Sequence, residues 1–137
     1  MRAASLFFAV RGLVRTKLAQ GKRLDPSAWL SVETMKFIAD ADHPNMRALA
    51  AHLSITAPSA TSLVRRLEKD GLVSRTTDPH DRRSARLSLT RKGKRALAKT
   101  LARGARILEE VFGVLSSREL AAFTRALERI RSGGEAC

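Results

Sequence analysis

Apolar residues recur every three or four positions along most of the chain, which is the spacing expected of amphipathic helices. This pattern predicts helices over residues 5–20, 26–41, 46–53, 56–70, 91–112 and 116–132. Two short stretches differ, because residues 72–75 begin a strand-like run and residues 85–89 alternate polar and apolar side chains. Alternation predicts a half-buried strand. The chain is therefore predicted to be mainly α-helical with one small β-hairpin.

Residues that favour helix ends stand at the boundaries of this pattern. Four side chains suited to accept hydrogen bonds from free N–H groups stand where helices are expected to start: Asp25, Asn45, Thr56 and Thr90. Ser116 and Glu119, three residues apart, have the spacing of a capping box. Gly71 suits a left-handed helix end. These signals agree with the helix boundaries that the apolar spacing predicts.

The helix predicted over residues 56–70 has two contrasting faces. Its expected core face consists of Ala60, Leu63, Val64 and Leu67. Its other sides carry hydroxyl and basic side chains, which allow close approach to base edges and contacts with bases or phosphates. We expect DNA binding here from Thr56, Ser59, Thr61, Ser62, Arg65 and Arg66. One of the two arginines is expected to bind guanine or phosphate, while the other pairs with Glu68 or Asp70.

The loop between the two predicted strands is basic and restrained by a proline. Arg82 and Arg83 follow Pro79, and we expect both arginines to contact DNA. Lys92 and Lys94 begin the next helix and are expected to hold phosphates rather than read bases. A helix for the major groove beside a loop for the neighbouring minor groove defines a winged helix-turn-helix.

Composition supports a nucleic-acid partner. The 137 residues favour one domain, and 26 Lys and Arg against 13 Asp and Glu give a formal charge of +13. Such an excess indicates a polyanion, with nucleic acid first and an anionic membrane second. The apolar run at residues 6–10 is interrupted by Arg11 and Arg15, so we expect neither a signal sequence nor a membrane partner. The single cysteine, Cys137, excludes an intramolecular disulfide, and we expect a cytoplasmic protein.

Other kinds of chemistry lack the residues they need. His43, His52 and His80 have no partners at ligand spacing, so no metal site or other cofactor is expected. No glycine-rich phosphate loop, nucleophile elbow or catalytic pair is present, which argues against an enzyme. The alternative is a basic RNA-associated or nucleoid-type structural protein. Base stacking on RNA needs exposed aromatics, and the chain has no Tyr, one Trp and five Phe.

The order of elements and two motifs resemble the MarR family of bacterial transcription regulators. The first motif is Leu67-Glu68-Lys69-Asp70-Gly71-Leu72-Val73 followed by Arg75, and the second is Asp81-Arg82-Arg83 followed by Leu87-Ser88-Leu89-Thr90 and Gly93. Both motifs at this spacing, with helices on either side, extend the resemblance over nearly the whole chain. It implies a single MarR-like domain, with a winged helix-turn-helix lobe over residues 26–90 and a helical dimerisation region over residues 1–22 and 91–132.

The resemblance also implies partners and roles. Members form homodimers that bind pseudo-palindromic operators in double-stranded DNA, and many repressors are released by a small aromatic acid. By this resemblance Arg83 enters the minor groove, and Asp81 holds the wing by pairing with an arginine. Apolar stripes at both chain ends agree with a dimer interface, which we assign to Leu6, Val10, Leu13, Leu108, Leu120, Phe123 and Leu127.

Overall fold

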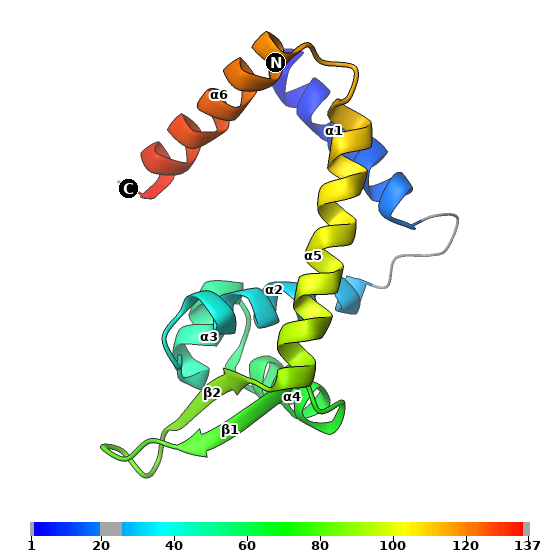
Figure 1. Ribbon diagram of the computed structural model, residues 1–137. Coiled ribbons are helices and arrows are strands. Elements are labelled where there is room, and N and C mark those ends of the chain that lie inside the picture. The colour runs from blue at the N-terminus through cyan, green and yellow to red at the C-terminus, as the bar shows by residue number, and fades with distance from the viewer. Residues whose placement is uncertain (1, 20–25, 136–137) are drawn as a thin grey trace. The chain divides into compact units, whose positions relative to one another are not determined.

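The computed structural model describes residues 2–19 and 26–135 and confirms a mainly α-helical fold with one antiparallel hairpin (Figure 1). The elements are α1 (Arg2–Ala19), α2 (Pro26–Asp40), α3 (Met46–Leu53), α4 (Ala57–Lys69), β1 (Val73–Thr77), β2 (Ala85–Leu89), α5 (Arg91–Phe112) and α6 (Ser117–Glu135). The predicted cap Asp25 and the lone Cys137 lie outside the described residues.

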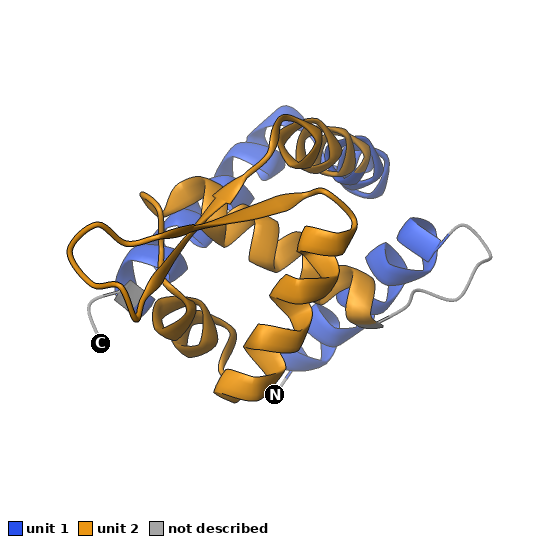
Figure 2. Ribbon diagram, turned by 90° about the horizontal axis from the view of Figure 1, so that it is seen from below, with its two compact units in different colours: residues 1–22, 104–137 blue, residues 23–103 orange. Residues whose placement is uncertain are grey.

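The chain divides into two compact units (Figure 2). Unit 1 contains residues 1–22 and 104–137, and unit 2 contains residues 23–103. The dimerisation region predicted to begin at residue 91 stays a prediction, but the division into compact units falls within α5, which packs with unit 2 up to Arg103. The physical reason is packing, because Leu97 is only 6% exposed and joins the core of unit 2.

The core of unit 2 lies among α2, α3, α4, the hairpin and the start of α5. It consists of Met35, Ile38, Leu49, Leu63, Val64, Leu67, Val73, Leu87 and Leu97. The face of α4 predicted to be internal is confirmed, since Ala60 is buried beside the three core residues of that helix. Full burial of one such leucine contributes about 1.5–3 kcal/mol. This packing fixes the orientation of α4 and leaves its opposite face free.

The helix caps expected inside the described chain are present. Asn45 Oδ1 accepts from Ala48 N at 2.8 Å, and Thr56 Oγ1 accepts from Ser59 N at 3.3 Å. Thr90 Oγ1 accepts from Gly93 N at 3.0 Å. Ser116 and Glu119 form the reciprocal bonds of a capping box, and Gly71 has the predicted positive φ of 72°. Each cap of this kind contributes about 1 kcal/mol.

Two helix ends differ from the prediction. Helix α1 begins at Arg2, three residues before the predicted start, and α6 continues through Gly133 and Gly134 to Glu135. The last helix was predicted to end at residue 132, directly before this pair of glycines. A glycine costs about 1 kcal/mol relative to alanine in a helix, which weakens a helix without ending it.

Unit 1 leaves large apolar side chains exposed. No residue of α1 is buried, and Leu6, Leu13 and Leu127 are 56%, 49% and 48% exposed. Within this unit the rings of Phe112 and Phe123 pack with centroids 5.2 Å apart. The predicted interface residues are therefore available on the surface of a single chain.

Candidate nucleic-acid interface

Helix α4 starts with a hydroxyl-rich cap that brings small side chains to its N-terminal end. Thr56 caps the helix, its hydroxyl shares a 2.8 Å hydrogen bond with that of Ser59, and a proline stands in the first turn. Because proline lacks the N–H that this turn does not use, it suits the position. Thr56 and Ser59 are both exposed, so a partner can reach the free end of the helix.

The outward face of α4 carries a row of polar and basic side chains. Ser62, Arg65 and Lys69 follow at spacings of three and four residues, opposite the buried row, and all three are exposed. Sequence reasoning identified the first two and missed Lys69. The sequence did contain a signal for Lys69, because a residue four positions after Arg65 lies on the same face of a helix.

Arg66 and Thr61 do not belong to this outward row. Arg66 Nη2 donates to Ser31 Oγ at 3.0 Å and to the Ser27 carbonyl at 3.4 Å, which ties α4 to α2. Thr61 is half-buried and donates to the Ala57 carbonyl at 3.0 Å. Of the two arginines, Arg65 is thus the one that points outward.

The expected pairing of one of these arginines with Glu68 or Asp70 was wrong, since neither arginine forms an ion pair within the described chain. Glu68 Oε2 instead accepts from Arg75 Nη2 at 2.8 Å. Arg75 lies on β1, opposite Leu87 of β2. This ion pair connects the last part of α4 to the hairpin, so the helix and the wing are held to each other by charge as well as by the apolar core.

The hairpin presents two arginines at its tip. Asp78 N donates to the Ser84 carbonyl, and Ser84 N donates to the Asp81 carbonyl, both at 2.9 Å, which closes the loop. Asp81 Oδ1 also accepts from Arg83 N at 2.9 Å. Arg82 and Arg83 are exposed. The loop backbone is therefore ordered by hydrogen bonds, while both guanidinium groups remain free to meet a partner.

The carboxylate that pairs with an arginine in the wing is Asp78, which corrects the role given to Asp81. Asp78 is only 7% exposed, and its Oδ2 accepts from Arg86 Nε at 2.9 Å. The hydrogen bond from His80 N, and then the Arg86 guanidinium, hold the pKa of Asp78 below its ordinary value. Asp81 has no ion pair within the described chain and acts through the backbone. Asp78 directly follows the last residue of β1, and Arg86 is the second residue of β2, paired with Thr76. The register of the hairpin therefore places the two residues diagonally across the strands, where long side chains can meet.

Arg86 also anchors the wing to the loop between α2 and α3. Its Nη1 donates to the His43 carbonyl at 3.4 Å, and Leu87 N donates to the Pro44 carbonyl at 2.9 Å. Arg86 further forms an isolated antiparallel bridge with Asn45. Strand β2 is thus bonded to the loop between α2 and α3. These bonds limit the positions that the tip of the hairpin can take.

The two lysines predicted to hold phosphates point to different sides of α5. Lys92 Nζ donates to the Asp70 carbonyl at 2.7 Å, at the C-terminal end of α4. Lys94 lines a hollow of about 430 Å³ between α2, β2 and α5, together with Leu89, Leu97 and Leu101. Both lysines are exposed, but only Lys92 lies next to α4.

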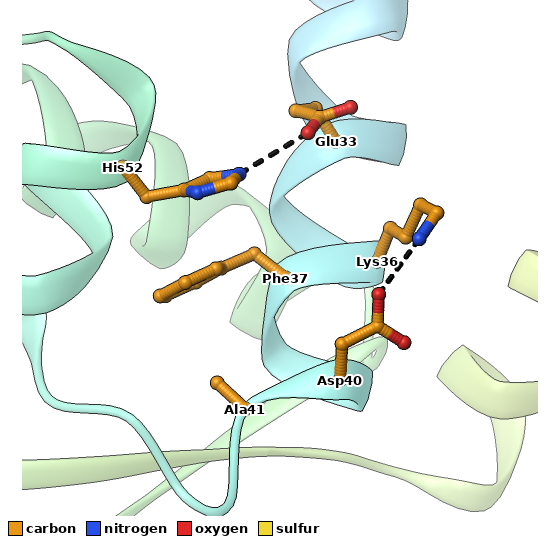
Figure 3. A pocket seen from close by; sticks show the side chains of 6 residues that line it. All are labelled: Glu33, Lys36, Phe37, Asp40, Ala41 and His52. Carbon is orange, nitrogen blue, oxygen red and sulfur yellow. Dashed lines mark hydrogen bonds and ion pairs between the residues drawn. The ribbon is translucent and has the colours of Figure 1, made fainter. Parts of the chain in front are cut away.

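A second hollow, of about 320 Å³, opens between α2 and α3 (Figure 3). The Phe37 and His52 rings stack there with centroids 4.2 Å apart, and His52 Nε2 lies 3.1 Å from Glu33 Oε1. Lys36 Nζ donates to Asp40 Oδ2 at 2.7 Å, and this bond raises the pKa of Lys36. Because its only lysine is already paired and two carboxylates border it, this hollow offers little to an anion.

Membrane spans require long apolar helices, and metal sites require grouped ligands. No helix over residues 2–19 and 26–135 is long and apolar enough to cross a membrane. In the same part of the chain, no three His, Cys, Asp or Glu side chains gather closely enough to hold a metal ion.

Helices α2, α3 and α4 pack around one core, α4 turns a polar and basic face outward, and the hairpin is attached beside it. This arrangement defines a winged helix-turn-helix protein. The sequence profile of the MarR family matches residues 30–85, which run from α2 to the start of β2. Over these residues the chain is similar to the MarR family, whose members are transcription regulators. The resemblance predicted from the two sequence motifs is confirmed.

Individual relatives agree with this assignment. YsmB, an uncharacterized HTH-type transcriptional regulator of Bacillus subtilis strain 168, is 28% identical over 83 residues, covering 61% of this chain and 57% of YsmB. A MarR family protein from Bacillus stearothermophilus superposes with a TM-score of 0.77 at 20% identity, over 97% of this chain and 90% of that one. BpsR of Bordetella bronchiseptica, whose DNA binding is regulated by 6-hydroxynicotinic acid, gives a TM-score of 0.67 at 19% identity, over 96% and 99% of the two chains.

Proposed function

We propose that this protein is a sequence-specific transcription regulator that binds double-stranded DNA as a homodimer and acts as a repressor. The proposal rests on one observation in unit 2: the polar face of α4 and the hairpin with its arginine tip, which is the wing, are fixed to each other. The exposed row of Ser62, Arg65 and Lys69 stands on a helix that Glu68 and Arg75 connect to the hairpin. A helix of this kind fits the major groove, and a neighbouring arginine loop fits the minor groove.

The two parts of the interface have different tasks. Ser62 and Arg65 meet base edges, and an arginine forms bidentate hydrogen bonds with guanine. Lys69 and Lys92 hold phosphates and set the register, because phosphate contacts position a protein without reading sequence. Arg82 and Arg83 reach the minor groove, where narrow A·T-rich segments concentrate negative potential. Affinity is expected to fall steeply with salt as these contacts release counterions.

Dimerisation follows from the apolar surface of unit 1. The exposed apolar side chains there include the seven assigned to the interface, which are Leu6, Val10, Leu13, Leu108, Leu120, Phe123 and Leu127. Many large apolar side chains exposed in one unit are typical of a protein interface, and a second copy of the chain brings the same stripes. A two-fold dimer matches a pseudo-palindromic operator whose half-sites lie about 34 Å apart, which is one turn of DNA.

The experiment that tests this function separates contacts that recognise the base sequence from contacts that only bind the DNA backbone. The operator is first selected from a random duplex library, and affinities are then measured for the wild type, Arg83→Ala, Ser62→Ala and Arg118→Ala. Arg83→Ala should weaken operator binding about tenfold or more, most at A·T-rich minor grooves. Ser62→Ala should cost less affinity but change which bases are tolerated. Arg118 is an exposed arginine of α6, outside unit 2, and its loss should change neither.

Two outcomes would contradict the proposal. If no duplex sequence is enriched by the selection, the protein is not a sequence-specific regulator. If Arg83→Ala binds as well as Arg118→Ala, the wing does not contact DNA.

We further propose that a small aromatic acid releases the protein from DNA by binding the hollow lined by Lys94. The hollow combines the ammonium of Lys94 with apolar Leu97 and Leu101, and one carboxylate, that of Asp42, also lines it. Lys94 has no ion pair within the described chain, so a ring that carries a carboxylate can pair with it. BpsR, a relative of the same fold, has its DNA binding regulated by 6-hydroxynicotinic acid. A ligand shifts the protein to a non-binding state only if it prefers that state.

Calorimetry with a panel of aromatic carboxylates tests this regulation. By reciprocity, an inducer must bind free protein more tightly than protein bound to operator. Lys94→Gln should weaken inducer binding, whereas Lys36→Gln, which changes a lysine at the other hollow, should not. Equal affinity of every compound for the free and DNA-bound protein would show that none of them is an inducer.

A further inference from the structure

The first half of α5 carries a row of cations along one side. Arg91, Arg95 and Lys99 follow at intervals of four residues, so they project from the same side of the helix. All three side chains are exposed, and none takes part in an ion pair within the described chain. We call these three residues the α5 stripe. The buried Leu97 lies on the opposite side, so the stripe faces away from the core.

This arrangement works against the stability of the helix. Like charges four residues apart repel each other. The first turn of α5 contains basic residues and no acidic residue, which the helix dipole also disfavours. From Arg82 to Leu108 the sequence has ten Lys and Arg and no Asp or Glu, so no neighbour in sequence balances the charge. A bound polyanion relieves the repulsion that the helix cannot relieve itself.

The direction of α5 decides which polyanion meets the stripe. From the end of β2, α5 leads away from the hairpin (Figure 1). Lys99 lies eight residues beyond Arg91 in the same helix, which is about 12 Å at 1.5 Å per residue. We therefore expect a straight duplex that lies along α4 and the wing tip to pass only the beginning of the stripe, which leaves the rest to another molecule.

We propose that the α5 stripe binds the phosphate backbone of a second DNA duplex, so that the protein holds its operator and a separate DNA segment at the same time. Duplex DNA carries a dense and regular row of negative charge, about one per 1.7 Å of helix axis. Such a row is complementary to the cations of the α5 stripe. Residues 91–103 contain no aromatic side chain on which unpaired bases could stack, which disfavours single strands. The inference rests on the proposed function, because it takes operator binding by α4 and the wing as given.

A bridging experiment tests the inference with the full-length chain. The selected operator is immobilised, saturated with protein and washed, and a labelled duplex of unrelated sequence is then added. The wild type should retain the labelled duplex, with retention that falls as salt is raised. Arg95→Gln with Lys99→Gln should reduce retention about tenfold or more and lower the salt slope by about 0.9 for each phosphate that is no longer neutralised. Affinity for the immobilised operator should not change.

The matched control removes two arginines from the polar side of α6. Arg125 and Arg129 are exposed and four residues apart, so Arg125→Gln with Arg129→Gln makes the same change in charge outside α5. This control should retain the labelled duplex as the wild type does. If the wild type binds its operator but retains no second duplex, the inference is wrong while the proposed function stands.

Three further outcomes would also overturn the inference. Equal retention by the α5 and α6 double variants would place the second duplex elsewhere, for example on the other DNA-binding lobe of the dimer. A loss of operator affinity in the α5 variant as large as its loss of bridging would make the stripe part of the operator interface. Retention of single-stranded RNA in preference to duplex DNA would identify a different partner.

Discussion

Gly93→Ala will strongly destabilise the protein, although it adds only one methyl group. A Cβ at this position would lie 2.0 Å from the carbonyl oxygen of Leu72, and that oxygen belongs to the backbone, which cannot rotate away. The same oxygen accepts hydrogen bonds from Thr90 N at 3.1 Å and Thr90 Oγ1 at 3.3 Å. The start of α5 must therefore move off the hairpin, at a cost of about 3 kcal/mol or more. Thermal unfolding should show a midpoint lower by about 10 °C.

Gly104→Ala is the matched control for this substitution. Gly104 lies in the same helix, and an added Cβ would meet no atom within 4 Å. Alanine should therefore raise stability by about 0.5–1 kcal/mol through its higher helix propensity. If the two variants unfold at the same temperature, close approach to Leu72 is not what position 93 requires.

Leu120→Asp with Phe123→Asp is expected to convert the proposed homodimer into monomers or insoluble protein. Both side chains belong to the exposed apolar surface of α6, at 43% and 37% exposure in the single chain. In the proposed dimer they are covered, and burying an unpaired carboxylate costs several kcal/mol. Since each 1.4 kcal/mol changes an equilibrium constant tenfold, two such charges should raise the dissociation constant by at least a thousandfold. Sedimentation at micromolar concentration measures the change in mass.

Further variants separate dissociation from unfolding. Phe123 also packs on Phe112 within the chain, so Leu127→Asp, which leaves that ring contact in place, should dissociate the dimer as well. Ala122→Asp with Arg129→Asp introduces two carboxylates on the exposed polar side of α6 and should leave the dimer intact. A wild-type protein that sediments as a folded monomer at micromolar concentration would refute the interface altogether.

Features that depend on neighbouring residues in the chain were predictable from the sequence. Helix positions follow from the spacing of apolar residues, and the caps at Asn45, Thr56 and Thr90 follow from side chains that bond N–H groups three residues away. The buried face of α4 and the exposed Ser62 and Arg65 follow in the same way, since one face of a helix fixes the other. The mainly α-helical class with a basic hairpin needed no more than these local rules.

Features that depend on contacts between distant segments required the folded chain. Arg65 and Arg66 are adjacent and chemically identical, yet only the packing of α4 on α2 turns Arg66 toward Ser31. The wing contains two aspartates, and hairpin pairing, not composition, brings Asp78 to Arg86. Gly93 looks like any other glycine in a helix until the Leu72 carbonyl is placed against it. Hydrogen bonds and steric contacts act over a few ångströms, so a sequence determines their candidates, and tertiary packing selects which of them meet.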